Sequence, residues 1–116
     1  MSIQRFGTTA RYSDVVVHQG VAYLAEVPPN PEAPVAEQAA ALLDRIDLLL
    51  QQAGSTREAL LMVNIYLADM ADYDAFNRCW DAWVPAGHAP ARACIEARLA
   101  NPAYRVEIVA TAAVLS

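Results

Sequence analysis

Two charged side chains stand within largely apolar stretches in the last third of this 116-residue chain. Arg92 is the one charged residue within residues 89–95, and Glu107 lies in the middle of residues 104–109. A guanidinium stays protonated at any ordinary pH, so a buried one needs an anionic partner, which is either a protein group or a ligand. A carboxylate within reach of a bound water can act as a general base. The two residues therefore predict a small hydrolytic site in which Arg92 holds a carboxylate and Glu107 activates water.

Strands and helices must position these two residues. Alternating β-branched, aromatic and other apolar residues predict strands over residues 14–18, 21–27, 61–67, 91–99 and 104–111. Gln19-Gly20 joins the first two strands in a hairpin. Apolar residues three and four apart predict helices over residues 34–53 and 73–84. The order of elements predicts one α+β domain over residues 1–116, a two-layer sandwich whose helices cover one face of a mixed sheet.

The side chains of the last two predicted strands alternate between the two faces of the sheet. We expect the alanines of residues 91–99 to face the helices, and Arg92, Cys94 and Glu107 to share the polar face. A direct hairpin between these two strands would place Arg98 opposite Arg105, and like charges on facing residues of paired strands are unfavourable. Either the register differs or another strand lies between these two strands, and we favour the crossover. The polar face carries few charges, so we expect it to pack on another subunit.

Composition and charge argue against several classes of function. The formal charge is −5 at pH 7 and all eight basic residues are scattered arginines, which favours neither a nucleic-acid partner nor an anionic membrane. No apolar run approaches the roughly 18 residues of a membrane span, and no signal peptide is predicted. Cys79 and Cys94 form neither a CxxC motif nor a zinc pattern. We expect a cytoplasmic protein without metal or other cofactor, and its 56% hydrophobic residues favour an oligomer.

Residues 90–95, Pro-Ala-Arg-Ala-Cys-Ile, and residues 106–108, Val-Glu-Ile, resemble the motifs P-A-R-x-C-[VI] and [IV]-E-I of the RidA (YjgF, reactive intermediate deaminase) family. Matches at Tyr12-Ser13, Asn30-Pro31 and Asn77 extend the resemblance over almost the whole chain. The resemblance implies a fold like that of the Bacillus-type chorismate mutase, with about six strands and two helices, and a homotrimer around a central barrel. It also implies cofactor-free hydrolysis of enamines and imines, such as 2-aminoacrylate and its tautomer, to a 2-keto acid and ammonia. The ligand clefts would lie between subunits.

The resemblance also assigns a role to individual residues. Arg92 would hold the substrate carboxylate with two parallel hydrogen bonds, and Glu107 would orient and deprotonate the attacking water. Cys94 would contact the reacting carbon through its backbone, and Tyr12 would close the pocket from a neighbouring subunit. Asn77 matches a further substrate-binding position, and its alternative is a satisfied polar group at a helix–sheet contact.

One segment departs from the family pattern. Leu24-Ala25-Glu26 replaces the family's Ser-Gly-Gln, so the serine hydroxyl that helps to hold the substrate is absent. We expect Leu24 to line a more apolar pocket that suits a different substrate side chain. Residues 11–16 and 80–88 likewise resemble a branch distinct from RidA proper.

Other interpretations of the same residues stay open. Arg92 could form a structural ion pair, for instance with Glu107 across a subunit seam. The same trimer could bind a small carboxylate without chemistry, as a sensor or scavenger, and the departure at Leu24 favours that reading. RNA cleavage is sometimes attached to this family, but the acidic charge argues against it. Cys94 is more typical of a small buried hydrophobe than of a nucleophile.

Overall fold

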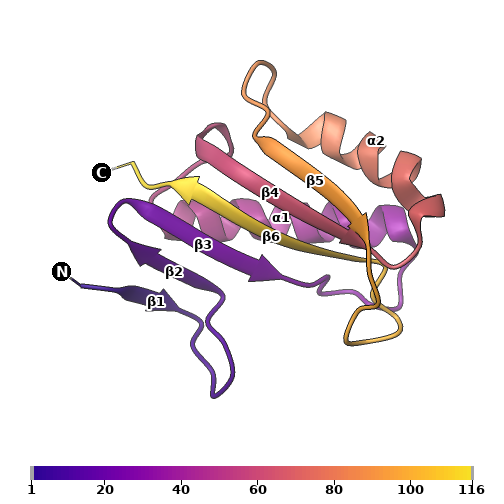
Figure 1. The fold of residues 1–116 in the computed structure, drawn as a ribbon, viewed down its shortest axis with the longest axis horizontal. Helices are drawn as coiled ribbons and strands as arrows, with labels where there is room; N and C mark the ends of the chain where they lie inside the picture. Colours follow the sequence, from indigo (N-terminus) through magenta and orange to yellow (C-terminus); the bar gives the residue numbers. More distant parts are fainter. Residues whose placement is uncertain (1, 116) are drawn as a thin grey trace.

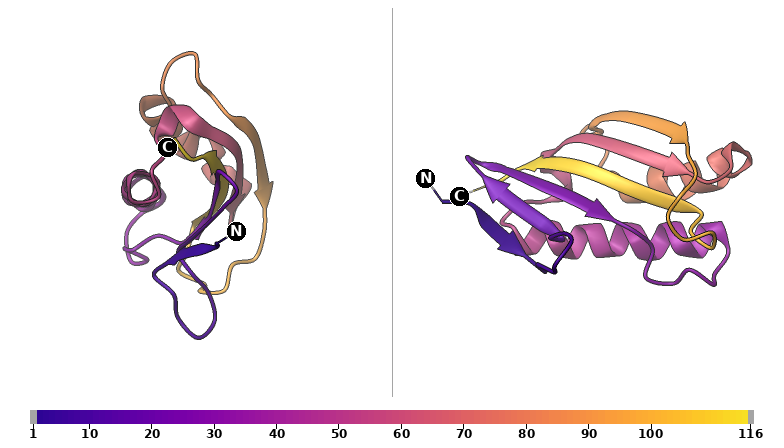
Figure 2. Two further views of the ribbon diagram at one scale, coloured as in Figure 1. Left: turned by 90° about the vertical axis from the view of Figure 1, so that its left-hand side faces the viewer. Right: turned by 60° about the horizontal axis from the view of Figure 1, so that its bottom comes forward.

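Residues 2–115, which this computed structural model describes, form a six-stranded mixed sheet with two α-helices packed on one face (Figure 1). The strand order is β1-β2-β3-β6-β4-β5, in which β4 and β5 run parallel and the other neighbours run antiparallel. Seen from the side, α1 lies against one face of the sheet and leaves the other face open (Figure 2). The predicted α+β sandwich is therefore confirmed. Within the described residues, no helix is long and apolar enough to cross a membrane.

The elements have the following bounds. The strands are β1, Gln4–Phe6; β2, Val15–His18; β3, Val21–Glu26; β4, Leu60–Leu67; β5, Ala91–Glu96; and β6, Val106–Ala113. The helices are α1, Val35–Gln52, and α2, Tyr73–Trp83. β1 was not expected, because a three-residue strand is too short to show a period of two.

Local signals placed the hairpin and the first helix correctly. Gln19 and Gly20 both have a positive φ, 51° and 79°, as a type I′ turn between β2 and β3 requires. Pro34 stands at the N-cap of α1, where its missing N–H costs nothing, and Gly54 follows the helix with a φ of 82°. These turn and cap residues explain why both boundaries agree with the sequence-based prediction.

The connection between β5 and β6 is a crossover, as the charge pattern favoured. β4 lies between the two strands, paired in parallel with β5 and antiparallel with β6. Arg98 and Arg105 are therefore not cross-strand neighbours, and the expected like-charge contact is avoided.

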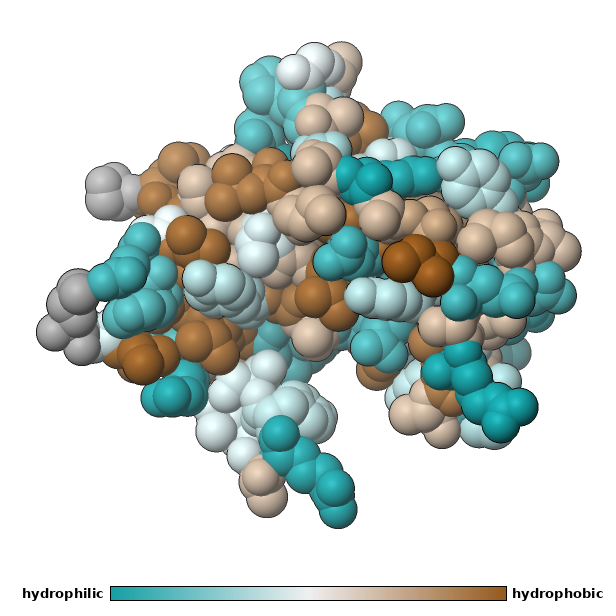
Figure 3. Space-filling view, viewed as in Figure 1, coloured by the Kyte–Doolittle hydropathy of each residue, from teal (hydrophilic) through white to brown (hydrophobic). Residues whose placement is uncertain are grey.

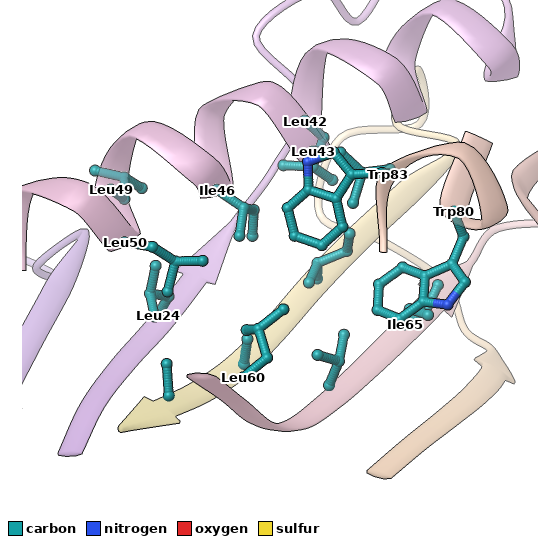
Figure 4. Close-up of a cluster of buried hydrophobic side chains, with 14 of the residues drawn as sticks. Leu24, Leu42, Leu43, Ile46, Leu49, Leu50, Leu60, Ile65, Trp80 and Trp83 are labelled. Carbon is teal, nitrogen blue, oxygen red and sulfur yellow. The ribbon is translucent and has the colours of Figure 1, made fainter. Parts of the chain in front are cut away.

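The core lies between the helices and the sheet (Figure 4). Helix α1 contributes an aliphatic stripe, and α2 contributes three aromatic side chains, Phe76, Trp80 and Trp83. The rings of Trp80 and Trp83 lie 5.7 Å apart, centroid to centroid. These two helices fix which face of each strand is buried, and so they decide where the charged residues point.

The face of β5 that was expected to be open lies against the helices instead. Arg92 pairs with Val63 of β4, and Cys94 pairs with Ile65. Val63 and Ile65 are buried beneath the helices, and cross-strand partners share a face, so Arg92 and Cys94 lie on the helix side. Glu107 of β6 lies on the open side instead, because its neighbours Val106 and Ile108 are the buried residues. The prediction that Arg92 and Glu107 share one face is therefore wrong.

The physical reason is the position of β5 at the edge of the sheet. An edge strand lies at the margin of the helical layer, where α2 presents polar and aromatic side chains rather than an aliphatic surface. The open face of the sheet carries exposed apolar side chains on β3, β4 and β5. Those that are 40–51% exposed are Tyr23, Leu61, Met62 and Ile95. Brown, apolar residues are visible across the sheet in the view of Figure 3.

Candidate functional site

Arg92 is held between β5 and α2 by neutral groups. Its Nη1 donates a hydrogen bond to Asn77 Oδ1 at 2.8 Å, and its Nη2 lies 3.4 Å from the Tyr73 hydroxyl. The guanidinium carbon also lies 5.4 Å from the ring centroid of Trp80 and 5.9 Å from that of Tyr73. Tyr73, Asn77 and Trp80 follow a spacing of four and three residues, which places them on one face of α2. Helix α2 therefore fixes the direction of the guanidinium without neutralising it.

The charge of Arg92 has no acidic partner within residues 2–115. The ion pairs among those residues involve Arg45, Arg57 and Arg105. Arg92 is also half-buried, so bulk water solvates its charge only in part. An ion pair with Glu107 inside the chain is absent from the described structure. The arrangement leaves donor capacity on a fixed guanidinium, which is what a carboxylate ligand requires.

Cys94 lies two residues beyond Arg92, on the same face of β5. Burial raises the pKa of the Cys94 thiol, and the nearby positive charge of Arg92 lowers it less than burial raises it. The thiol is therefore protonated at neutral pH. A raised pKa fits a packing residue rather than an activated nucleophile.

Glu107 lies on the open face of the sheet, opposite to the face of Arg92, and lines a separate hollow. A cavity of about 520 Å³ lies between the β1–β2 loop and the β5–β6 loop, and Glu107, Tyr12, Tyr104 and Ala25 are among its lining residues. The notch between these two loops is visible at the lower edge of Figure 3. Tyr12 is 60% exposed on the first loop, and Glu107 is half-buried. The structure thus places Tyr12 and Glu107 at one cavity.

The two groups of predicted residues do not meet within one chain. Glu107 is level with Tyr66 on β4, and Tyr66 is level with Ile95 on β5, three residues beyond Arg92. Three residues along a strand and two strand spacings across the sheet separate the α-carbons of Arg92 and Glu107 by about 14 Å, on opposite faces. We call Arg92 with Asn77 and Cys94 the carboxylate half-site, and Tyr12 with Glu107 the water half-site.

Leu24 belongs to neither half-site. Its side chain is 2% exposed and packs beneath α1, near Leu50 (Figure 4). On β3, residues 22, 24 and 26 face the helices, whereas Ala25 faces the open side and lines the cavity. The expectation that the Leu24 side chain lines the pocket is therefore corrected, because the strand alternation turns that side chain into the core.

Sequence reasoning missed two features of these half-sites. The first is the pair of aromatic rings of Tyr73 and Trp80 around Arg92; their spacing on α2 was visible, but not their partner on β5. The second is Glu26, which is 6% exposed and also lines the cavity of the water half-site. Burial raises the pKa of Glu26 to about 7, although its hydrogen bond with Arg45 opposes the shift. Nothing in the local sequence of Glu26 indicates that shift.

A metal cluster is not among the features of this structure. Within residues 2–115, no group of three or more His, Cys, Asp and Glu side chains is placed to hold a metal ion.

Comparison with known proteins gives a consistent result over the full chain. Residues 2–114 match the model of a family described as Endoribonuclease L-PSP. The RutC family protein YoaB of Escherichia coli (strain K12) is 47% identical over 98% of this chain and 100% of its own length. A RutC family protein of Haemophilus ducreyi is 45% identical over 97% of each chain. The crystal structure of NMB1025 from Neisseria meningitidis, a member of the YjgF protein family, superposes with a TM-score of 0.95 at 50% identity, over 100% of this chain and 98% of that one.

Proposed function

Since the chain belongs to the Endoribonuclease L-PSP family, within the YjgF/RidA superfamily, we propose that it hydrolyses reactive 2-imino acids and their enamine tautomers without a cofactor. The products are a 2-keto acid and ammonia. One observation carries the proposal. Arg92 is a half-buried cation, and the groups that hold it, Asn77, Tyr73 and Trp80, are all neutral.

Arg92 binds the substrate carboxylate in this proposal. A guanidinium presents parallel N–H groups that match the two oxygens of a carboxylate, so one contact fixes both the position and the plane of the substrate. The bond to Asn77 Oδ1 and the ring of Trp80 restrict the rotation of Arg92 before the substrate arrives. A pre-positioned cation therefore reduces the entropy that binding must lose.

Glu107 activates the water. Its carboxylate takes a proton from water as the oxygen bonds to the imine carbon, the electron pair of the C=N bond moves to nitrogen, and Glu107 passes that proton to the nitrogen, which gives the carbinolamine. Glu107 then takes the hydroxyl proton as the carbonyl forms and gives it to the nitrogen as the C–N bond breaks, so that ammonia leaves. Both protons that the nitrogen gains come from the water, and Glu107 ends as the carboxylate that it was at the start.

A homotrimer with clefts between subunits completes the site in this proposal. The α-carbons of Arg92 and Glu107 lie about 14 Å apart and their side chains point to opposite faces of one sheet, so a substrate of a few carbon atoms cannot bridge them within one chain. The exposed apolar side chains of the open face, such as Met62 and Ile95, supply a surface on which further copies can pack. Packing of that kind brings the carboxylate half-site of one subunit to the water half-site of the next.

A coupled assay tests this function. An amino-acid oxidase or a dehydratase generates the imino acid, and its decay is followed with and without the protein, using 2-aminoacrylate and bulkier 2-imino acids. Acceleration by wild-type protein, lost in Arg92→Ala, supports the proposal. If no imino acid decays faster than in buffer, the protein is not a deaminase. Light scattering of the same sample should give the mass of a trimer.

The second candidate is a trimer that binds a small carboxylate without chemistry. The separation of Arg92 from Glu107 favours it, because the carboxylate half-site alone suffices for binding. Titration calorimetry with a 2-keto acid distinguishes the two, since the binder gives heat but no turnover. The family description also names endoribonucleases, but a formal charge of −5 offers little attraction for an RNA backbone.

A further inference from the structure

Three charged side chains meet where β3, α1 and the β1–β2 loop come together. Arg45 Nε of α1 donates to Glu26 Oε1 at 2.6 Å, and Arg45 Nη2 lies 3.4 Å from Asp14 Oδ2. Both carboxyl groups thus lie at the same guanidinium, and Asp14 is near enough to Glu26 to raise the pKa of its carboxyl group. Two carboxyl groups therefore share a single guanidinium.

This cluster holds one proton more easily than isolated carboxylates do. With both acids ionised, one negative charge is in excess, and Glu26 is 6% exposed and poorly solvated. A single proton on the two acids brings the net charge of the cluster to zero and removes the repulsion between the two carboxylates. The raised pKa of Glu26, about 7, has burial as its main cause, and the proximity of Asp14 raises it further.

Asp14 is also the residue at which the β1–β2 loop returns to the sheet (Figure 1). Its N–H donates to Phe6 O at 2.9 Å, so the two ends of residues 7–14 are joined. Its carboxyl group packs against the α-carbon of Gly7, where a Cβ would collide with Asp14 Oδ2. The same loop carries Tyr12 at the water half-site, whose cavity Asp14, Glu26 and Arg45 also line.

We propose that Asp14, Glu26 and Arg45 form a pH-dependent latch that docks residues 7–14 on the sheet and so positions Tyr12 at the cavity. With one proton on the carboxyl pair, the latch is closed. When that proton is lost, the two carboxylates repel each other, and Asp14 moves away together with the loop. The role of Tyr12 at the substrate rests on the proposed function, whereas the docking of the loop does not.

The direction of the pH effect follows from the closed state, which binds the proton more tightly than the open one. Opening the loop gives Glu26 more contact with water and takes Asp14 away, and both changes weaken the causes that raise the pKa of Glu26 to about 7 in the closed state. Docking is therefore strongest well below pH 7 and weakens as the pH rises through 7. Arg45 stays charged throughout, and the other titratable groups of the cavity are Tyr12, Tyr104 and Glu107.

Tryptic cleavage after Arg11 reports the open loop, because a protease must draw several loop residues into its active site, and residues 7–14 can adapt in that way only when they are released from the sheet. Cleavage is followed by mass spectrometry between pH 5.5 and pH 8 for wild type, Glu26→Gln and Asp14→Asn. Asp44→Asn serves as the matched control, since Asp44 is an exposed acid of the same helix as Arg45. Dividing each rate by that of Glu26→Gln at the same pH cancels the pH dependence of trypsin itself.

We expect the ratio of wild type to Glu26→Gln to rise at least about threefold between pH 5.5 and pH 8, and Asp44→Asn to follow wild type. Asp14→Asn removes the other carboxylate of the repelling pair, so its cleavage rates should equal those of Glu26→Gln. Either variant can therefore serve as the reference if the other folds poorly. A ratio that stays constant with pH overturns the latch.

Gly7→Ala provides a test that leaves every charge in place. The new Cβ displaces the Asp14 carboxyl group, and Gly7 has a φ of 63°, which also disfavours a side chain. Cleavage at Arg11 should then be fast at every pH, and a wild-type profile in this variant contradicts the proposal. If cleavage follows the latch but no imino acid is hydrolysed, the latch stands and the proposed function fails.

Discussion

Removing the guanidinium of Arg92 is the sharpest perturbation of the carboxylate half-site. In Arg92→Ala the side chain loses its bond to Asn77 Oδ1 and its contacts with the rings of Trp80 and Tyr73. None of these partners is charged, so no buried acid is left without a partner. The substitution therefore separates the loss of a ligand-binding charge from the loss of a structural ion pair.

The two losses differ in magnitude. The hydrogen bond from the charged guanidinium to Asn77 contributes about 1.5 kcal/mol and a partly exposed cation–π contact about 0.5–1 kcal/mol, so the free energy of unfolding should fall by about 2–3 kcal/mol. Two charge-assisted bonds to a substrate carboxylate contribute about 1.5–3 kcal/mol each, which corresponds to a loss of roughly 100-fold or more in kcat/KM. A domain of ordinary stability stays folded after such a loss, so kcat/KM should fall about 100-fold or more in a protein that is still folded.

Three measurements on the same sample check this expectation: kcat/KM in the coupled imine assay, urea unfolding, and the mass by light scattering. Arg78→Ala is the matched control, since Arg78 is an exposed arginine of α2 with no ion pair among residues 2–115. Arg92→Lys keeps the charge without the planar fork and should recover only part of the activity. If Arg92→Ala keeps wild-type kcat/KM, or loses the oligomer while Arg78→Ala does not, the assignment of Arg92 to the substrate is refuted.

Three further predictions concern Glu107, Glu26 and Gln38. Glu107→Gln should lower kcat by about 100-fold with little change in the affinity for a 2-keto acid, measured by calorimetry, because it removes the base and keeps the shape; unchanged kcat argues for a structural role. Because the pKa of Glu26 is raised to about 7 from 4.5, the stabilisation from its protonation, about 3 kcal/mol, is lost as the pH rises from about 4.5 through 7. Urea unfolding of wild type relative to Glu26→Gln should show this decline, and parallel pH profiles would contradict it. Gln38 is fully buried: its two side-chain N–H groups donate among three backbone carbonyl oxygens, each 3.0 Å from Nε2, and its Oε1 accepts from the backbone N–H of Arg105. Gln38→Leu should therefore cost about 3 kcal/mol or more in urea unfolding, and a loss below about 1 kcal/mol would show that the site relaxes.

The sequence by itself determined both α-helices, every strand except β1, and the chemistry of the two key residues. Gln19-Gly20 specifies its turn through backbone conformation, and Pro34 and Gly54 bound α1 in the same local way. The types of Arg92 and Glu107 limit them to holding an anion and accepting a proton. All of these inferences depend on properties of a residue and its near neighbours along the chain.

Only the tertiary structure decided which way those residues point. The face of Arg92 depends on its register with Val63, and the burial of Leu24 depends on α1 covering that side of β3. The pKa of Glu26 depends first on its burial beneath α1 and then on Arg45 and Asp14, which come from two other parts of the chain. A strand alternates its side chains with a fixed period, but which of its two faces becomes the inside is set by the partners it pairs with and the helices that cover it. That choice is a long-range one, and no local pattern contains it.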